Sequence, residues 1–193
     1  LATNIAETSL TVEGVSIVID AGYSRVPKFS PRNGLTKLET VRVTVSSADQ
    51  RRGRAGRTGP GICYRLWTEE EQRQLKPYND PEIVTSDLSS LALDLALWGV
   101  SDPAELEWLN PPPEGAYQQA KELLALLGAL DAEGRVTPHG RLIAAVGTHP
   151  RLASMIVRAK PLGLGQLACE LSVLLEERAA SADIDMRTQV EEL

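Results

Sequence analysis

Short apolar runs rich in β-branched residues mark the first third of the chain. Residues 15–20 and 62–67 each form a run of the kind that is buried in parallel sheets. Between them, residues 25–30 and 35–45 flank the sequence Pro-Arg-Asn-Gly, and an Asn-Gly pair in that setting is a strong hairpin signal. The pattern therefore predicts an α/β layer from which a basic β-hairpin projects.

Apolar positions at helical spacing replace these runs in the rest of the chain. Ser86 is expected to cap a helix that ends at Gly99, and a second apolar stripe covers one face of residues 116–127. Residues 130–137 indicate a small hairpin, after which a Thr-Pro pair begins another helix. Helix, helix, hairpin and helix in this order resemble a winged helix, and the apolar stripes that begin near residue 148 predict a helical bundle.

Composition and length place the chain among globular proteins. Its 193 residues carry 20 Lys or Arg against 26 Asp or Glu, and 42% of them are hydrophobic. No run approaches the roughly 18 apolar residues of a membrane span, and the first residues lack the pattern of a secretory signal. We therefore expect a cytoplasmic protein with no membrane partner. Cys63 and Cys169 lie far apart with no second Cys or His near either, so neither a metal site nor a disulfide framework is expected.

Arginine is concentrated in one segment of this acidic chain. Residues 24–57 contain nine basic and two acidic residues, although the formal net charge of the whole chain is −6. Such a concentration favours local binding of a phosphate over general coating of nucleic acid. A solvated basic face is the alternative at this level.

The candidate chemistry gathers in Gln-Arg-Arg-Gly-Arg-Ala-Gly-Arg, residues 50–57. In a helix, Gln50, Arg54 and Arg57 stand at i, i+4 and i+7 and share one face, and Gly53 keeps the helix surface low beside them. Each glycine costs about 1 kcal/mol in a helix relative to alanine, so close approach of a ligand explains the sequence better than stability does. Guanidinium groups suit the oxygens of a transferring phosphoryl group. The alternative is a surface arginine helix that pairs with acidic neighbours.

A second polar segment, residues 3–14, precedes the apolar run at residues 15–20. Its Ser, Thr and Asn residues are placed where the C-terminal edge of a parallel sheet binds phosphate or sugar. The same residue types also cap helices and close turns, and the residues alone leave both interpretations open.

Together, the two segments resemble motifs V and VI of the DEAH-box helicases of superfamily 2. The match is T-N-I-A-E-T-S-L-T followed by Q-R-x-G-R-A-G-R, and His-Pro-Arg-Leu-Ala at residues 149–153 resembles the bacterial HrpB-type branch. The resemblance covers nearly the whole chain. It implies the C-terminal part of the second RecA-like domain over residues 1–76, a winged-helix domain over 77–147, and the truncated start of a ratchet-like helical bundle over 148–193.

In that family, the motif VI glutamine and two arginines face the γ-phosphate of ATP bound between two RecA-like domains. The resemblance therefore implies that Gln50 positions the attacking water and that Arg57, together with Arg54, acts as an arginine finger. Three further residues are implied to bind the nucleotide: Thr11, Glu13 and Gly53. The family usually has Asp where this chain has Glu13. The chain therefore departs from the family pattern at the residue that is implied to contact the ribose.

The same resemblance implies an RNA partner, single-stranded or partly duplex, that is gripped without reading of its bases. Thr3 and Asn4 match residues that touch the RNA backbone. The basic hairpin would lie beside the strand as a separating element, through Arg25, Lys28 and Arg32.

Two motifs that the family needs are missing from these residues. There is no Gly-x-x-x-x-Gly-Lys-Ser/Thr phosphate loop and no Asp-Glu-x-His segment to hold Mg²⁺. We therefore expect the first RecA-like domain, with the Mg²⁺ ligands, to lie upstream and to be the partner of this chain. The full-length protein is expected to be an ATP-dependent RNA helicase that uses ATP with Mg²⁺, and the 193 residues alone are expected to be inactive.

Two other functions compete with this interpretation. The first is a non-enzymatic, nucleic-acid-binding winged-helix adaptor that carries a RecA-like remnant, against which the overall acidity counts. The second is a plain interaction scaffold, which leaves the arginine segment unexplained.

Overall fold

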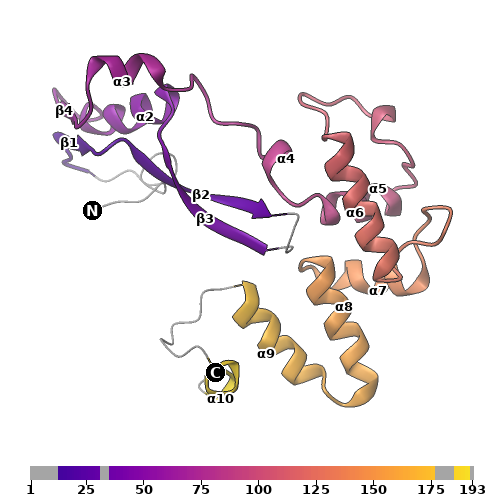
Figure 1. Cartoon of the computed structure of the whole chain (residues 1–193). Coiled ribbons are helices and arrows are strands. Elements are labelled where there is room, and N and C mark those ends of the chain that lie inside the picture. The colour runs from indigo at the N-terminus through magenta and orange to yellow at the C-terminus, as the bar shows by residue number, and fades with distance from the viewer. Residues whose placement is uncertain (1–12, 31–34, 177–184, 192–193) are drawn as a thin grey trace. The chain divides into compact units, whose positions relative to one another are not determined.

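The computed structural model of the chain describes residues 13–30, 35–176 and 185–191 (Figure 1). The chain divides into two units, Leu1–Ser86 and Asp87–Leu193. The three-part division that the sequence suggests stays a prediction.

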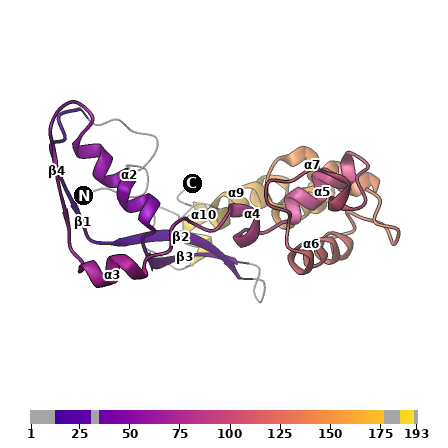
Figure 2. The same cartoon turned by 90° about the horizontal axis from the view of Figure 1, so that it is seen from above.

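A two-stranded parallel sheet forms the base of the first unit. Strand β1 (Ile17–Asp20) pairs with β4 (Ile62–Arg65) so that Ile17 lies opposite Ile62. Helix α2 (Val45–Ala55) packs against both strands, and Figure 2 shows it running beside them. This arrangement confirms an α/β fold with a small parallel sheet.

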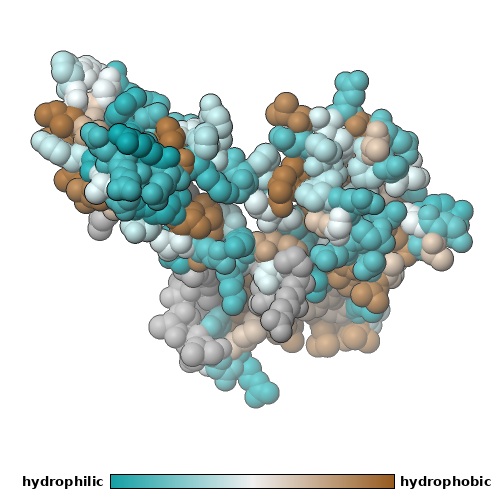
Figure 3. Space-filling model, turned by 45° about the horizontal axis from the view of Figure 1, so that its top comes forward, coloured by the Kyte–Doolittle hydropathy of each residue, from teal (hydrophilic) through white to brown (hydrophobic). Residues whose placement is uncertain are grey.

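Side chains alternate between the two faces of this sheet. Asp20 is buried on the face that α2 covers. The other face carries Ile17, Ile19, Ile62 and Tyr64, and Ile19 is 68% exposed. Brown patches mark apolar side chains at the molecular surface in Figure 3. The expectation that both strands are fully buried was therefore wrong for the described residues, since only one face of the sheet packs against α2.

The predicted basic hairpin is confirmed by the pairing of two long strands. Strand β2 (Tyr23–Ser30) runs antiparallel to β3 (Leu35–Arg42), with Tyr23 opposite Arg42. Figure 2 shows the hairpin extending from the end of β1. The Asn-Gly turn, at residues 31–34, lies outside the described residues.

Two short helices complete the first unit. Helix α3 (Glu69–Gln74) begins with a capping box, in which Thr68 accepts a hydrogen bond from the Glu71 amide and the Glu71 carboxylate accepts one from the Thr68 amide. The Thr68 amide lowers the pKa of the Glu71 carboxyl. Helix α4 (Glu82–Thr85) follows a proline-rich stretch.

The second unit is a series of helices in which sequence neighbours pack together. Helix α5 packs against α6 and α7. Helix α8 packs against both α7 and α9. The largest fully buried apolar side chains include Leu95 of α5, Leu124 of α6 and Ile143 of α7. The helices are α5 (Ser89–Leu97), η1 (Pro103–Glu105), α6 (Glu114–Leu126), α7 (Pro138–Val146), α8 (Pro150–Ala159), η2 (Lys160–Leu162), α9 (Gly165–Glu176) and α10 (Met186–Glu191).

The small hairpin predicted between α6 and α7 is present as one antiparallel bridge, which pairs Leu130 with Val136. Thr137 follows it and begins α7: its hydroxyl accepts a hydrogen bond from the Gly140 amide at 2.9 Å and donates one to the Gly128 carbonyl at 2.6 Å. The order helix, helix, hairpin and helix is therefore seen in α5, α6, the bridge and α7. Its assignment as a winged helix stays a prediction.

The start of α5 differs from the expectation that Ser86 caps this helix. The helix begins at Ser89, whose amide donates to the Asp87 carboxylate at 2.6 Å, and Ser86 instead follows the end of α4. His149 Nε2 lies 3.4 Å from the same carboxylate, while its Nδ1 accepts from the Arg151 amide at the start of α8. Burial raises the pKa of Asp87, but the hydrogen bonds from His149 and Ser89 outweigh it and lower that pKa from 3.8 to about 2. Asp87 thus links the beginnings of α5 and α8.

Candidate functional site

Helix α2 carries the motif that the sequence singles out, and its first turn is fully capped. The Thr44 hydroxyl accepts a hydrogen bond from the Ser47 amide at 3.2 Å. The amides of Val45 and Ser46 donate to the carbonyls of Lys76 and Pro77, at 2.9 and 3.1 Å. Because these N–H groups already have acceptors, the start of the helix is not an anion site. A ligand must instead be bound by side chains farther along.

Gln50 and Arg54 lie one turn apart on α2, as predicted, and Gln50 is exposed. The helix ends at Ala55 and is capped by Gly56, so Arg57 follows the helix in a turn. The expectation that one helix face extends through Arg57 is therefore corrected: the turn, rather than the helix period, places this side chain. The closely spaced glycines of this segment explain why the helix ends at Ala55, since glycine disfavours helix continuation.

Two glycines near the end of α2 have opposite surroundings. Among the described residues, a Cβ atom built on Gly53 meets no atom within 4 Å, so these residues leave the surface beside Gln50 and Arg54 low. A Cβ atom on Gly61 would lie 2.0 Å from the Ala55 carbonyl oxygen, because β4 begins directly against the end of the helix. Gly53 therefore leaves space for another molecule at the helix surface, whereas Gly61 allows the start of β4 to contact the backbone of Ala55.

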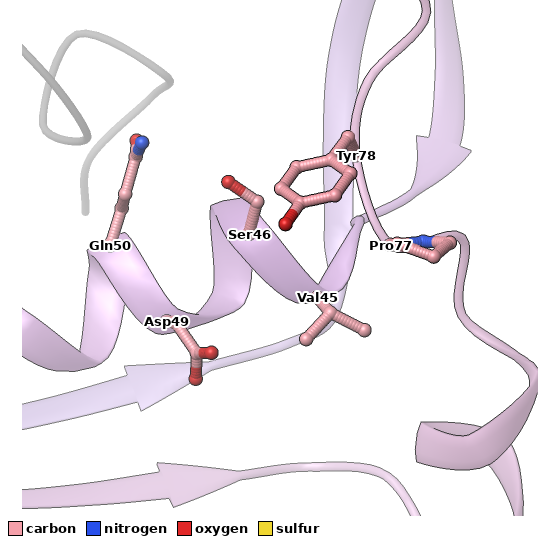
Figure 4. A pocket seen from close by; sticks show the side chains of 6 residues that line it. All are labelled: Val45, Ser46, Asp49, Gln50, Pro77 and Tyr78. Atoms are coloured by element: carbon pink, nitrogen blue, oxygen red, sulfur yellow. The ribbon is translucent and has the colours of Figure 1, made fainter.

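An open hollow of about 510 Å³ borders the first half of α2. In Figure 4, Gln50 and Ser46 point to the same side of the helix, toward the side on which Tyr78 lies, while Val45 and Asp49 point to the other side. Tyr78 is 75% exposed, and no local pattern predicts its place beside Gln50, because 27 intervening residues separate them. The lining residues are Val45, Ser46, Asp49, Gln50, Pro77 and Tyr78.

Of the predicted nucleotide and RNA contacts, some lie on described elements and others do not. Thr3, Asn4, Thr11 and Arg32 lie outside the described residues. Glu13 is exposed in the turn that precedes β1. Arg25 is exposed on β2, and Lys28 on the same strand pairs with Glu39 of β3 at 3.0 Å.

Arg51, next to Gln50, points elsewhere: it lies against the ends of the strands and pairs with Asp20 of β1 at 2.9 Å. In the sequence, Arg51 is only one of several residues in the basic segment, and no pattern singles out Asp20. A helix period of about 100° per residue would have separated Arg51 from the Gln50 face, but the partner on β1 is 31 residues away and no local pattern names it.

Other chemistries find little support in the described part of the chain. Burial raises the pKa of the Cys63 thiol, although Arg65 opposes this effect, so Cys63 is poorly suited to act as a thiolate. Among residues 13–30, 35–176 and 185–191, no group of three or more His, Cys, Asp or Glu side chains could hold a metal ion. Nor does that part of the chain contain a helix long and apolar enough to cross a membrane.

Comparison with known proteins shows which helicases the chain is similar to. Residues 1–59 match the helicase conserved C-terminal domain. The chain is 46% identical over 186 residues to the ATP-dependent RNA helicase HrpB of Escherichia coli (strain K12), a match that covers 96% of this chain and 23% of that protein. The pre-mRNA-splicing factor ATP-dependent RNA helicase prp22 of Schizosaccharomyces pombe is 39% identical over 176 residues, which cover 91% of this chain and 15% of that protein. The crystal structure of the Escherichia coli DEAH/RHA helicase HrpB superposes with a TM-score of 0.91 at 45% identity, covering 99% of this chain and 24% of that one. Nearly the whole chain is therefore similar to proteins named as DEAH/RHA helicases, and its first 59 residues match the helicase conserved C-terminal domain.

The chain spans about a quarter of the length of the HrpB proteins that it matches. Its α2 motif fits a nucleoside triphosphate on two grounds. The donors of Gln50, Arg54 and Arg57 suit phosphate oxygens, and the open space above Gly53 admits a phosphate close to the helix.

Proposed function

We propose that this chain is the C-terminal part of an ATP-dependent RNA helicase, in which ATP hydrolysis between two RecA-like domains drives translocation on RNA and unwinding. The observation that supports this most directly is on α2: Gln50 is exposed, Arg54 lies one turn along, and Gly53 between them leaves the helix surface open, with Arg57 following the helix end. Relatives that share this sequence are named ATP-dependent RNA helicases. Residues 1–76 would be the C-terminal part of the second RecA-like domain, residues 77–147 the winged helix, and residues 148–193 the start of the helical bundle.

In this proposal, ATP supplies the terminal phosphoryl group that is transferred to water. Gln50 holds that water through its side-chain amide, which borders the hollow beside α2. Arg54 and Arg57 place guanidinium groups against the oxygens of the terminal phosphate and stabilise the charge that develops there. Thr11 and Glu13 would lie beside the nucleotide, with Glu13 on the ribose. The Mg²⁺ ligands and the phosphate loop would belong to the upstream RecA-like domain.

RNA binding would follow from the hairpin and from the segment before β1. Arg25 and Lys28 both lie on β2, where their charges can neutralise backbone phosphates. Arg32, which follows β2 in the sequence, would add a third basic side chain to this series. Thr3 and Asn4 would contact the RNA backbone. Contacts with phosphate and ribose carry no base information, so we propose binding that does not depend on sequence.

The decisive experiment compares Arg57→Ala with the parent in the complete protein, by RNA-stimulated ATP hydrolysis. Loss of an arginine finger should lower kcat by about 10³-fold or more. Arg52→Ala is the matched control, because Arg52 is a neighbouring arginine that is exposed and pairs with Asp49 at 3.5 Å. Equal rates for the parent and Arg57→Ala would remove Arg57 from the mechanism.

The adaptor alternative makes a different forecast for the same samples. An adaptor binds nucleic acid without any turnover of ATP, in the complete protein as in the 193 residues. The helicase proposal requires that the complete protein hydrolyse ATP and that the 193 residues alone do not, because the arginines then have no cradled triphosphate to act on.

A further inference from the structure

Arg51 leaves α2 on the side opposite to solvent and reaches the junction of two strands. Its side chain is 18% exposed. One terminal nitrogen donates to the Asp20 carboxylate at 2.9 Å and to the Tyr23 carbonyl at 3.0 Å, and the other donates to the Ser24 hydroxyl at 3.3 Å. Asp20 is the last residue of β1, and Tyr23 and Ser24 begin β2. A single guanidinium therefore bonds to the end of the sheet and to the base of the hairpin.

Asp20 needs this cation because its carboxylate is almost inaccessible. The side chain is 1% exposed, and the same oxygen that binds Arg51 also accepts from the Gly22 amide at 2.9 Å. Its other oxygen has no hydrogen-bond partner in the described part of the chain. A buried carboxylate without a cation is strongly unfavourable, so Arg51 and Asp20 stay together.

The turn between Asp20 and β2 leaves little freedom for the hairpin base. Gly22 has φ of +78°, and a Cβ atom there would lie 2.8 Å from the Trp67 ring. The other strand is fastened separately: Arg42, at the end of β3, pairs with Glu71 of α3 at 3.0 Å and lies over the Tyr23 ring at 5.1 Å. Arg51 thus fastens α2 to the start of β2, whereas β3 continues into α2 through Val43 and Thr44 and is held to α3 by Arg42.

We infer that Arg51 is a positioning residue that couples α2 to the hairpin, so that a displacement of the nucleotide-facing helix moves the element beside the RNA. The inference rests on the proposed function, because it assigns the nucleotide to the Gln50 face of α2 and the RNA to the hairpin. Gln50 and Arg51 are consecutive in a continuous helix, so their backbone atoms move together. Arginine is required because its planar fork serves three acceptors at once, whereas the single ammonium of lysine can satisfy Asp20 but not all three.

The test is Arg51→Lys in the complete protein, beside Arg52→Lys as the control. Arg52 is the next residue on the same helix, but its side chain is 62% exposed and its pairing is with Asp49 on the same helix. Two quantities are measured: base pairs unwound per ATP hydrolysed, and the change in amide hydrogen exchange of β2 and β3 when a non-hydrolysable ATP analogue binds. For Arg51→Lys we expect the first to fall by about tenfold, a coupling loss of ordinary size, and the second to disappear. Arg52→Lys should match the parent in both.

Failure of this inference can be told apart from failure of the proposed function. A parent that hydrolyses ATP and unwinds RNA, together with an Arg51→Lys variant that matches Arg52→Lys in both measurements, overturns the coupling role alone. A parent that neither binds nor hydrolyses ATP overturns the proposed function and the inference with it. If Arg51→Lys does not fold, Ser24→Ala removes one acceptor at the hairpin base, and it must lower unwinding per ATP in the same direction; an unchanged ratio overturns the inference.

Discussion

Replacing Gly61 with alanine should displace the end of α2 and impair catalysis without touching a catalytic residue. The new Cβ would lie 2.0 Å from the Ala55 carbonyl oxygen and 2.4 Å from its carbonyl carbon, whereas real Cβ contacts essentially never fall below 3.0 Å. The two backbones must therefore separate by about 1 Å. Ala55 stands between Arg54 and Arg57, so both guanidinium groups move with it. A misplacement of about 1 Å can lower a catalysed rate by about 10²-fold.

The assay is kcat for RNA-stimulated ATP hydrolysis by the complete protein, with thermal unfolding measured on the same samples. We expect a kcat lower by about 10²-fold and, because overpacking of this size costs about 1–3 kcal/mol, a protein that is less stable but still folded. Gly59→Ala is the control: it lies in the same turn, and its Cβ would meet no atom within 4 Å. A Gly61→Ala enzyme that turns over as fast as Gly59→Ala would refute the argument that the end of the helix sets the arginine positions.

Three further changes test the site and the second unit. Gly53→Ala should stabilise the protein by about 1 kcal/mol, since alanine is the better helix former, yet lower ATP turnover by filling the space beside the phosphate; a raised melting temperature with unchanged kcat would contradict close approach of a ligand. Asp87→Asn should destabilise the second unit by about 2 kcal/mol at pH 7, the energy equivalent of lowering its pKa from 3.8 to about 2. Because the pKa of Asp87 is lower in the folded state, this stabilisation is complete above pH 3.8 and is lost as the pH falls toward 2. The free energies of unfolding of the parent and the variant should therefore converge near pH 2, as measured by urea unfolding followed by pulsed hydrogen exchange. Asp94→Asn, at an exposed position, is the control. Thr137→Ala should cost about 1 kcal/mol in thermal unfolding by removing the cap on the Gly140 amide, whereas Thr137→Ser should retain most of it.

Elements with strong local signals could be predicted from the sequence. The β-branched run of β1 and the short apolar run of β4 indicate a sheet, and the Asn-Gly pair between two extended segments indicates a hairpin, because both signals depend on residues that are neighbours in the chain. Thr137 followed by proline also gave the correct start of α7. At the start of α5 the local signal fails: the Ser89 amide donates to Asp87, one position after Ser86, and the same carboxylate lies 3.4 Å from His149, a contact that no local pattern indicates.

The contacts that orient the candidate site could not be predicted in the same way. Arg51 and Asp20 are separated by 31 positions, and Arg42 and Glu71 by 29, so only the completed sheet brings each pair together. Any of the nine basic residues in this segment could have been matched with several acids of the chain. The choice is made by burial, because Asp20 is excluded from water by the packing of α2 on the sheet and must then take the nearest guanidinium.

The two glycines at the end of α2 show how a functional glycine differs from a structural one. Gly61 has a reason inside the fold, because the Ala55 carbonyl occupies the place of its side chain. Gly53 has none: a Cβ there meets no atom, its backbone has an ordinary negative φ, and it weakens the helix that carries it. A residue that lowers stability and leaves unfilled space on its own chain is explained by something that approaches from outside. Alanine at Gly61 should therefore lower stability and activity together, whereas alanine at Gly53 should move them in opposite directions, and only the second pattern indicates a bound ligand.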